Sequence, residues 1–139
     1  MEYLKIIFIL CGISVFTSCA SSSQPNKYVL VGSVQWVLIE KNDDGDSFYI
    51  DPQTLRKNGT IRVVWVIEQL AARDKDGEKS RRRRFEFDCT NERFRVLSST
   101  THSGPMTSGK LLATMGETQW YDIPPGTAIS TKLEYVCAR

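Results

Sequence analysis

Residues 61–70 read Ile-Arg-Val-Val-Trp-Val-Ile-Glu-Gln-Leu, and this stretch decides the fold. It is rich in β-branched and aromatic residues, which favour strands. Because side chains alternate along a strand, the odd positions from Ile61 to Ile67 share one apolar face, and Val64 and Val66 lie on the other. A strand that is apolar on both faces at its middle is typical of a central strand with another layer packed over it.

Short β-prone runs flank this stretch on both sides and alternate with turn residues, which indicates an antiparallel sheet. We expect strands at residues 34–39, 47–51, 61–70, 81–88 and 94–98. Asp-Gly and Asn-Gly pairs in the connections favour the positive φ of tight hairpins. Pro52 is expected to end the second strand, because proline donates no ladder hydrogen bond. Consecutive hairpins of this kind predict a β-meander.

The region after residue 98 is less regular. Residues 98–109 are mostly Ser, Thr, Gly and Pro, and we expect a long exposed loop, followed by one more strand at 110–115. Thr127 is a candidate helix N-cap. In residues 128–137, apolar side chains spaced three and four apart predict an amphipathic helix, and alternation of Leu133, Tyr135 and Cys137 leaves a strand as the rival interpretation.

The N-terminus predicts export. The chain has 139 residues, 41% of them hydrophobic and 24% charged, a composition that predicts one globular domain. Before that domain, Lys5 precedes an apolar run over residues 6–16 and then small residues, the pattern of a signal peptide. Residues 15–19 resemble a bacterial lipobox, so we expect a lipoprotein signal peptide at 1–18 and a lipid on Cys19. Cleavage after Ala20, which discards Cys19, is the alternative.

Residues 19–27 are polar and aperiodic, and we expect a flexible lipid-anchored tether there. A single domain is then expected over residues 28–139. Because Ala20 rather than Asp follows the lipidated cysteine, the resemblance to lipoproteins implies the outer membrane of a two-membrane bacterium. The predicted partner of the N-terminus is therefore a membrane, held through the lipid.

The cysteines predict a disulfide. Cys11 lies in the signal peptide and Cys19 carries the lipid or is discarded, so Cys89 and Cys137 remain in either case. An even pair in an oxidising compartment most simply forms a disulfide. A metal site is not predicted, because His102 is the only histidine and no other cysteine remains. No cofactor is predicted either.

A set of short motifs follows in order along the chain. They are Phe48-Tyr49-Ile50-Asp51, Val63-Val64-Trp65, Phe85-Glu86-Phe87-Asp88-Cys89, Met106 with Gly109-Lys110, Trp120-Tyr121-Asp122-Ile123-Pro124-Pro125-Gly126-Thr127 and Val136-Cys137. Their order, with the two cysteines, resembles the surface-adhesin protein E family of small bacterial envelope proteins. The resemblance implies an α+β fold with an antiparallel meander of about six strands, and a C-terminal helix tied to the concave face by the disulfide. It also implies adhesion to host extracellular-matrix proteins, and a homodimer through the sheet.

The run Arg81-Arg82-Arg83-Arg84 is the sharpest charge feature. With Lys79 and Arg73 it is a candidate ligand-binding patch for acidic host proteins, glycosaminoglycan or lipid phosphates. The alternative is a solvated start of a strand, since charged residues protect exposed strands and the preceding loop carries acidic residues. Nucleic acid is not a predicted partner, because the formal net charge is only +2 and the chain is expected to leave the cytoplasm.

Catalysis is not predicted. His102 lies among serines and threonines, but neighbouring residues on a loop rarely hold the fixed geometry that catalysis requires. Residues 40–51 superficially resemble a calcium loop, but they lie between strands, and Asp51 stands where a bidentate glutamate is needed. We therefore expect a surface-exposed, non-catalytic lipoprotein that binds host matrix or other proteins. The alternative is a periplasm-facing envelope lipoprotein with a structural or inhibitory role.

Overall fold

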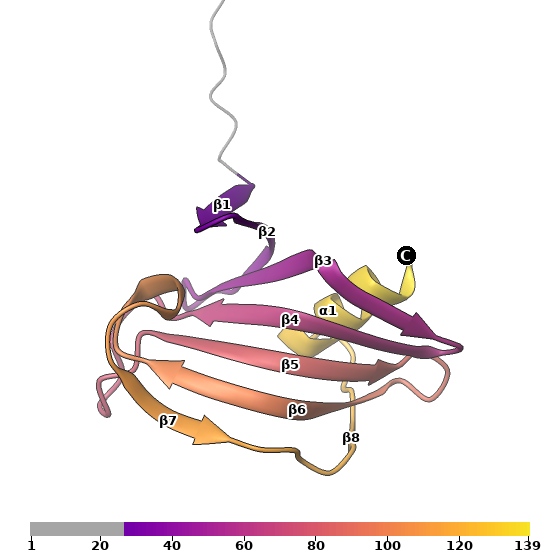
Figure 1. Ribbon diagram of the computed structural model, residues 1–139. Coiled ribbons are helices and arrows are strands. Elements are labelled where there is room, and N and C mark those ends of the chain that lie inside the picture. The colour runs from indigo at the N-terminus through magenta and orange to yellow at the C-terminus, as the bar shows by residue number, and fades with distance from the viewer. Residues whose placement is uncertain (1–26) are drawn as a thin grey trace, which may run out of the picture.

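The computed structural model describes residues 27–139. They form one antiparallel sheet with an α-helix at the C-terminal end against one face (Figure 1). The predicted signal peptide and Cys19 lie outside the described residues. Within residues 27–139, no helix is long and apolar enough to cross a bilayer. We call the sheet face toward the helix the inner face and the opposite one the outer face.

The strands follow one another in space as they do in the chain. The elements are β1 (Tyr28–Val31), β2 (Val34–Lys41), β3 (Ser47–Asn58), β4 (Ile61–Gln69), β5 (Ser80–Asp88), β6 (Arg93–His102), η1 (Pro105–Thr107), β7 (Leu111–Met115), β8 (Tyr121–Asp122) and α1 (Ala128–Cys137). Strands β1 to β7 pair in that order, and β8 pairs with β6. The predicted meander is confirmed, but the described sheet has eight strands rather than about six. Strands β1 and β8 are too short to show an alternating pattern.

Strand β3 does not end at Pro52, and the prediction of a stop there is wrong. Pairing between β3 and β4 stops at Asp51 and resumes at Arg56. Within this bulge the backbone N–H of Trp65 donates to the Thr54 side-chain oxygen over 3.1 Å. The Thr54 hydroxyl therefore takes the place of a backbone carbonyl in the ladder. Pro52 lies in the bulge, where the ladder does not require a backbone N–H from it.

Strand β6 is longer than expected, so the prediction of a loop beginning at Ser98 is wrong. Residues 98–102 pair with β5 on one side, and residues 99–102 pair with β7 on the other. Ser99 is buried between these neighbours. Because hydrogen-bond ladders on both sides hold these residues in the sheet, this part of β6 needs few apolar side chains. Its polar composition therefore gave no strand signal in the sequence. Strand β7 confirms the prediction of one more strand after the loop.

The turn after β6 covers one end of the outer face. The backbone N–H of Met106 donates to the Gln69 side-chain oxygen over 2.7 Å, and that of Thr107 donates to the Ser80 hydroxyl over 2.9 Å. Ile67, on the same face as Gln69, is only 1% exposed. Strand β4 is central in the sheet and covered on both faces, as predicted.

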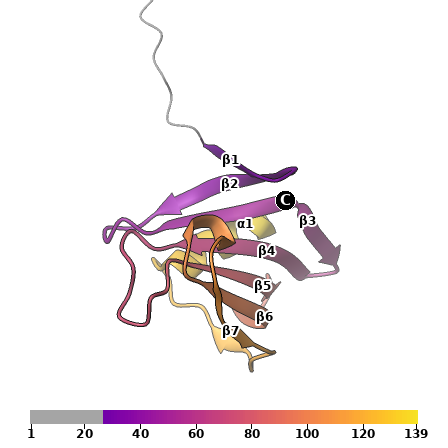
Figure 2. The same cartoon turned by 60° about the vertical axis from the view of Figure 1, so that its left-hand side comes forward.

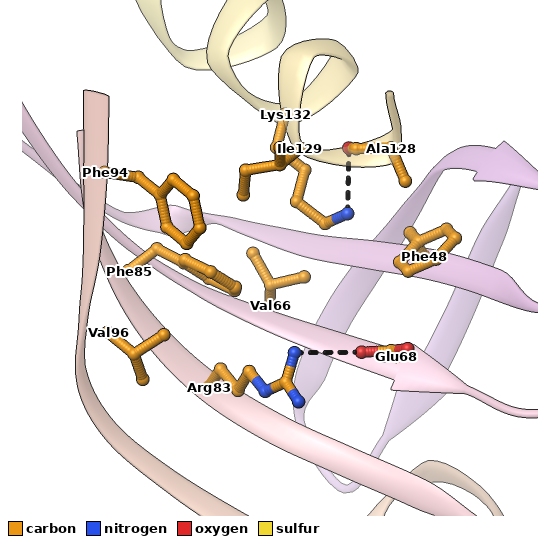
Figure 3. A pocket seen from close by; sticks show the side chains of 10 residues that line it. All are labelled: Phe48, Val66, Glu68, Arg83, Phe85, Phe94, Val96, Ala128, Ile129 and Lys132. Atoms are coloured by element: carbon orange, nitrogen blue, oxygen red, sulfur yellow. Dashed lines mark hydrogen bonds and ion pairs between the residues drawn. The ribbon is translucent and has the colours of Figure 1, made fainter. Parts of the chain in front are cut away.

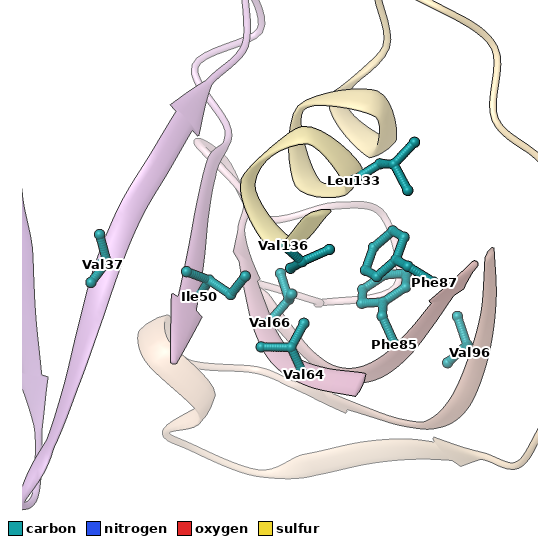
Figure 4. Close-up of a cluster of buried hydrophobic side chains, with 9 residues drawn as sticks. All are labelled: Val37, Ile50, Val64, Val66, Phe85, Phe87, Val96, Leu133 and Val136. Carbon is teal, nitrogen blue, oxygen red and sulfur yellow. The ribbon is translucent and has the colours of Figure 1, made fainter. Parts of the chain in front are cut away.

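The hydrophobic core lies between α1 and the inner face (Figure 4). Its buried members are Val37, Ile50, Val64, Val66, Phe85, Phe87, Val96, Leu133 and Val136. In Figure 4 the strands curve around the helix, and Figure 2 shows the helix behind the sheet from a second side. The apolar residues on both faces of β4 predicted a second layer packed over the sheet, and the helix supplies that layer on the inner face.

The C-terminal segment is a helix, and the strand interpretation of it is wrong. The Thr127 side chain accepts a hydrogen bond from the Ser130 N–H, and the Ser130 side chain accepts one from the Thr127 N–H. This reciprocal cap confirms Thr127 as the N-cap. At the other end of the helix, Cys137 is joined to Cys89 by a disulfide, as predicted, and the bond fastens α1 to the end of β5.

Candidate functional site

The arginine run on β5 does not form one patch. Alternation along the strand places Arg81 and Arg83 on the inner face and Arg82 and Arg84 on the outer face. The register agrees, because Arg83 pairs with the core residue Val66. The predicted ligand-binding residues are thus divided into two pairs with different surroundings.

The inner arginines are held by carboxylates of the same chain. Arg81 and Arg83 each reach one oxygen of the Glu68 carboxylate, over 3.4 and 3.2 Å. Arg81 also forms an ion pair with Glu78, whose residue is buried. Burial lowers the pKa of the Arg83 guanidinium, and the negative charge of Glu68 opposes that shift. These two arginines neutralise the buried Glu78 and the partly buried Glu68, and are poor candidates for contact with a macromolecule.

The outer arginines are exposed. The Arg82 guanidinium lies 4.2 Å from the centre of the Trp65 ring, and Arg84 pairs with Trp65 across the ladder. Further along this face, the guanidinium groups of Arg93 and Arg95 lie 4.8 and 4.9 Å from the centre of the Trp120 ring. Arg93 also forms an ion pair with Asp88, and Arg95 forms ion pairs with Glu86 and Glu117, so both are held by carboxylates of the same chain, as the inner arginines are. We therefore call the set Trp65, Arg82 and Arg84 the outer arginine–tryptophan surface.

A cavity lies on the inner face, beneath the first turn of α1 (Figure 3). Its volume is about 250 Å³. It is lined by Phe48, Val66, Glu68, Arg83, Phe85, Phe94, Val96, Ala128, Ile129 and Lys132. In Figure 3 the aromatic rings of Phe85 and Phe94 lie at one end of the cavity, and the Glu68 carboxylate lies at the other.

Lys132 brings a buried ammonium group to this cavity. The residue is only 4% exposed. Its nitrogen donates to the Ala128 carbonyl over 2.9 Å and lies 3.7 Å from the centre of the Phe48 ring. Burial lowers the pKa of Lys132 from 10.5 to about 8, although the charges of Glu68 and Glu40 act in the opposite direction. The cavity thus combines an apolar wall with a buried ammonium group that has fewer hydrogen-bond acceptors than donors, and burial of such a cation costs free energy.

Sequence reasoning missed Lys132. The signal was present, because Lys132 lies three residues after Ile129 and four before Val136 and therefore on the apolar stripe of the helix. A lysine at such a position either extends its stem to reach solvent or stays buried, and only the structure shows that it stays buried.

His102 does not lie on a loop. It ends β6, where one ring nitrogen lies 3.0 Å from the Thr100 hydroxyl. In the region that resembles a calcium loop, the Asp46 carboxylate accepts hydrogen bonds from the Asn42 side-chain amide over 3.5 Å and from the Ala71 backbone N–H over 2.8 Å. The Asp46 backbone N–H donates to the Asn42 side-chain oxygen over 2.8 Å, so these side chains close a turn. Within residues 27–139 no cluster of three or more His, Cys, Asp or Glu side chains has the arrangement of a metal site.

Comparisons with known proteins identify the fold and the family. In solved structures, crystal form II of Haemophilus influenzae protein E superposes with a TM-score of 0.59 and 16% identity, covering 83% of this chain and 94% of that chain. The selenomethionine form of the same protein gives a TM-score of 0.58 and 15% identity, covering 83% and 92%. At such identities the likeness shows the fold alone.

The sequence comparisons are more specific. No curated protein matches the chain significantly. The profile of the family described as surface-adhesin protein E matches residues 36–138, which includes every strand from β3 onward, the disulfide and α1. The chain therefore belongs to the surface-adhesin protein E family.

Proposed function

We propose that the chain is a lipid-anchored outer-membrane protein that is displayed on the bacterial cell surface and binds host matrix proteins or other protein ligands without catalysis. Membership of a family of surface adhesins, over residues 36–138, carries this proposal. The predicted signal peptide and the lipid on Cys19 provide its route to the membrane and its anchor.

The outer arginine–tryptophan surface is the proposed contact region. Arg and Trp are the residue types that most often dominate the energy of protein interfaces. Stacking on Trp65 holds the Arg82 guanidinium beside a flat apolar ring, so the side chain loses less freedom when a ligand binds. An acidic protein segment complements such a surface in charge.

The binding test compares two charge reversals. The double variant Arg82→Glu, Arg84→Glu alters the outer surface, and the double variant Arg56→Glu, Lys57→Glu makes the same change of charge on exposed residues of β3. With immobilised matrix proteins, we expect the first variant to bind at least about tenfold more weakly and the second to bind as the wild type does. Equal loss in both variants contradicts a specific surface and indicates a general effect of charge.

The anchor is tested separately. Growth with labelled palmitate is expected to label the wild-type protein and not a Cys19→Ser variant. Labelling of both proteins, or of neither, contradicts lipidation at this cysteine. The result does not depend on which ligand the domain binds.

A further inference from the structure

The cavity beneath α1 has the features of a binding site for a small molecule. Its two ends differ in chemistry, with Phe85, Phe94 and Val96 at one end and charged groups at the other. A volume of about 250 Å³ corresponds to about eight water molecules in the liquid, at about 30 Å³ each. Ligand sites are typically apolar clefts with a few converging polar groups, and this one is at the small end of their range.

Lys132 is the first polar group that converges on the cavity. An ammonium has three hydrogen-bond donors, and within the described residues Lys132 has one oxygen acceptor, the Ala128 carbonyl. Within residues 27–139 no carboxylate forms an ion pair with its nitrogen, and the ion pairs of the nearby Glu68 go to Arg81 and Arg83. A buried cation without an ion-pair partner is expensive to keep.

Arg83 supplies a second donor. One of its terminal nitrogens donates to Glu68 over 3.2 Å, and the other terminal nitrogen has no acceptor among the described residues. In Figure 3 Lys132 descends from α1 and Arg83 projects from β5 into the same space. Two positively charged groups with unused donors therefore border one cavity, at the end away from Phe85 and Phe94.

We propose that this cavity binds a small organic monocarboxylate with a short apolar body. The carboxylate accepts hydrogen bonds from Lys132 and from the free terminal nitrogen of Arg83, and the body packs against Phe85, Phe94 and Ile129. An anion is favoured over a neutral ligand because charge-assisted hydrogen bonds are about twice as strong as neutral ones. The volume limits the ligand to about eight to ten non-hydrogen atoms.

The test uses ligand pairs that differ only in charge, measured by calorimetry on the purified protein at pH 7. Hexanoate and benzoate are expected to bind, and hexanamide and benzamide are expected to bind at least about tenfold more weakly. Amide resonances of residues 128–132 are expected to shift in NMR spectra when hexanoate is added. Equal binding of acid and amide overturns the proposal, and so does the absence of binding at millimolar hexanoate.

A matched pair of variants assigns the site. Lys132→Met keeps the length of the side chain and removes its charge, and it is expected to lower hexanoate affinity to that of hexanamide. Lys75→Met makes the same change on a side chain that is 89% exposed, and it is expected to leave the affinity unchanged. Unchanged hexanoate affinity in Lys132→Met overturns the assignment. If that variant does not fold, the wild-type acid and amide pairs still decide the question.

This inference is independent of the proposed adhesion. Matrix binding is assigned to the outer face, and the carboxylate site lies on the inner face beneath α1. Loss of matrix binding in the outer-face variant with retained hexanoate binding, or the reverse, separates the two proposals.

Discussion

Replacement of Lys132 by methionine is expected to change how stability depends on pH. Burial lowers the pKa of this lysine from 10.5 to about 8, so the folded chain holds the proton less tightly than the unfolded chain does. Between these two pH values the unfolded chain binds more protons, and the wild-type free energy of unfolding therefore rises with pH. At pH 6.5 the charged, buried ammonium destabilises the fold by about 3 kcal/mol, and by pH 9.5 about 2 kcal/mol of this is relieved.

The assay is chemical denaturation of wild type and Lys132→Met at pH 6.5 and pH 9.5, without added carboxylate. We compare the free energy of unfolding of the variant minus that of the wild type. This difference is expected to be about 2 kcal/mol more positive at pH 6.5 than at pH 9.5. Other titrating groups cancel in this difference. Glu68 and Glu40 favour the charged form of Lys132 and Arg83 opposes it, and all three are present in both proteins. Lys75→Met is the control, with a constant difference from wild type. A constant difference for Lys132→Met as well would refute the buried-ammonium argument.

Three further predictions concern the helix and its attachments. Reduction of the Cys89–Cys137 bond, which closes a loop of 48 residues, is expected to lower the free energy of unfolding by about 4 kcal/mol; no difference between oxidised and reduced protein in urea denaturation contradicts this. Thr127→Ala removes the side chain that caps α1 and is expected to cost about 1 kcal/mol, whereas Thr90→Ala in an exposed turn is expected to cost less in the same assay. Val136→Ala, at a fully buried position, is expected to cost about 2 kcal/mol through a cavity, and a loss below that of Thr127→Ala contradicts the assigned core.

The sequence predicts the sheet well where one pattern dominates. The apolar residues on both faces of strand β4 predict its central position. The pair Asn58-Gly59 predicts a tight hairpin turn, and Gly59 adopts the positive φ of +56° that such a turn needs. Proline and polar runs mislead because tertiary contacts compensate for them. Thr54 supplies the acceptor that a ladder carbonyl supplies elsewhere, and Ser99 is buried because strands lie on both sides of it.

The candidate sites are harder to predict because they depend on which face each side chain takes. The arginine run shows its charge in the sequence, but its division follows only once the register places Arg83 opposite Val66. The acids that hold the inner arginines come from another strand and a connecting loop. The position of Lys132 on the apolar stripe of α1 is visible in the sequence, whereas the cavity it borders is formed by four separate strands and the helix.

Display on the cell surface is the central claim, and treatment of intact bacteria with a membrane-impermeant amine-reactive label tests it most directly. Lys75 lies in an exposed connection of the domain and is expected to be labelled on intact cells as fully as on cells whose outer membrane has been permeabilised. Labelling that appears only after permeabilisation would place the domain in the periplasm and contradict an adhesive role.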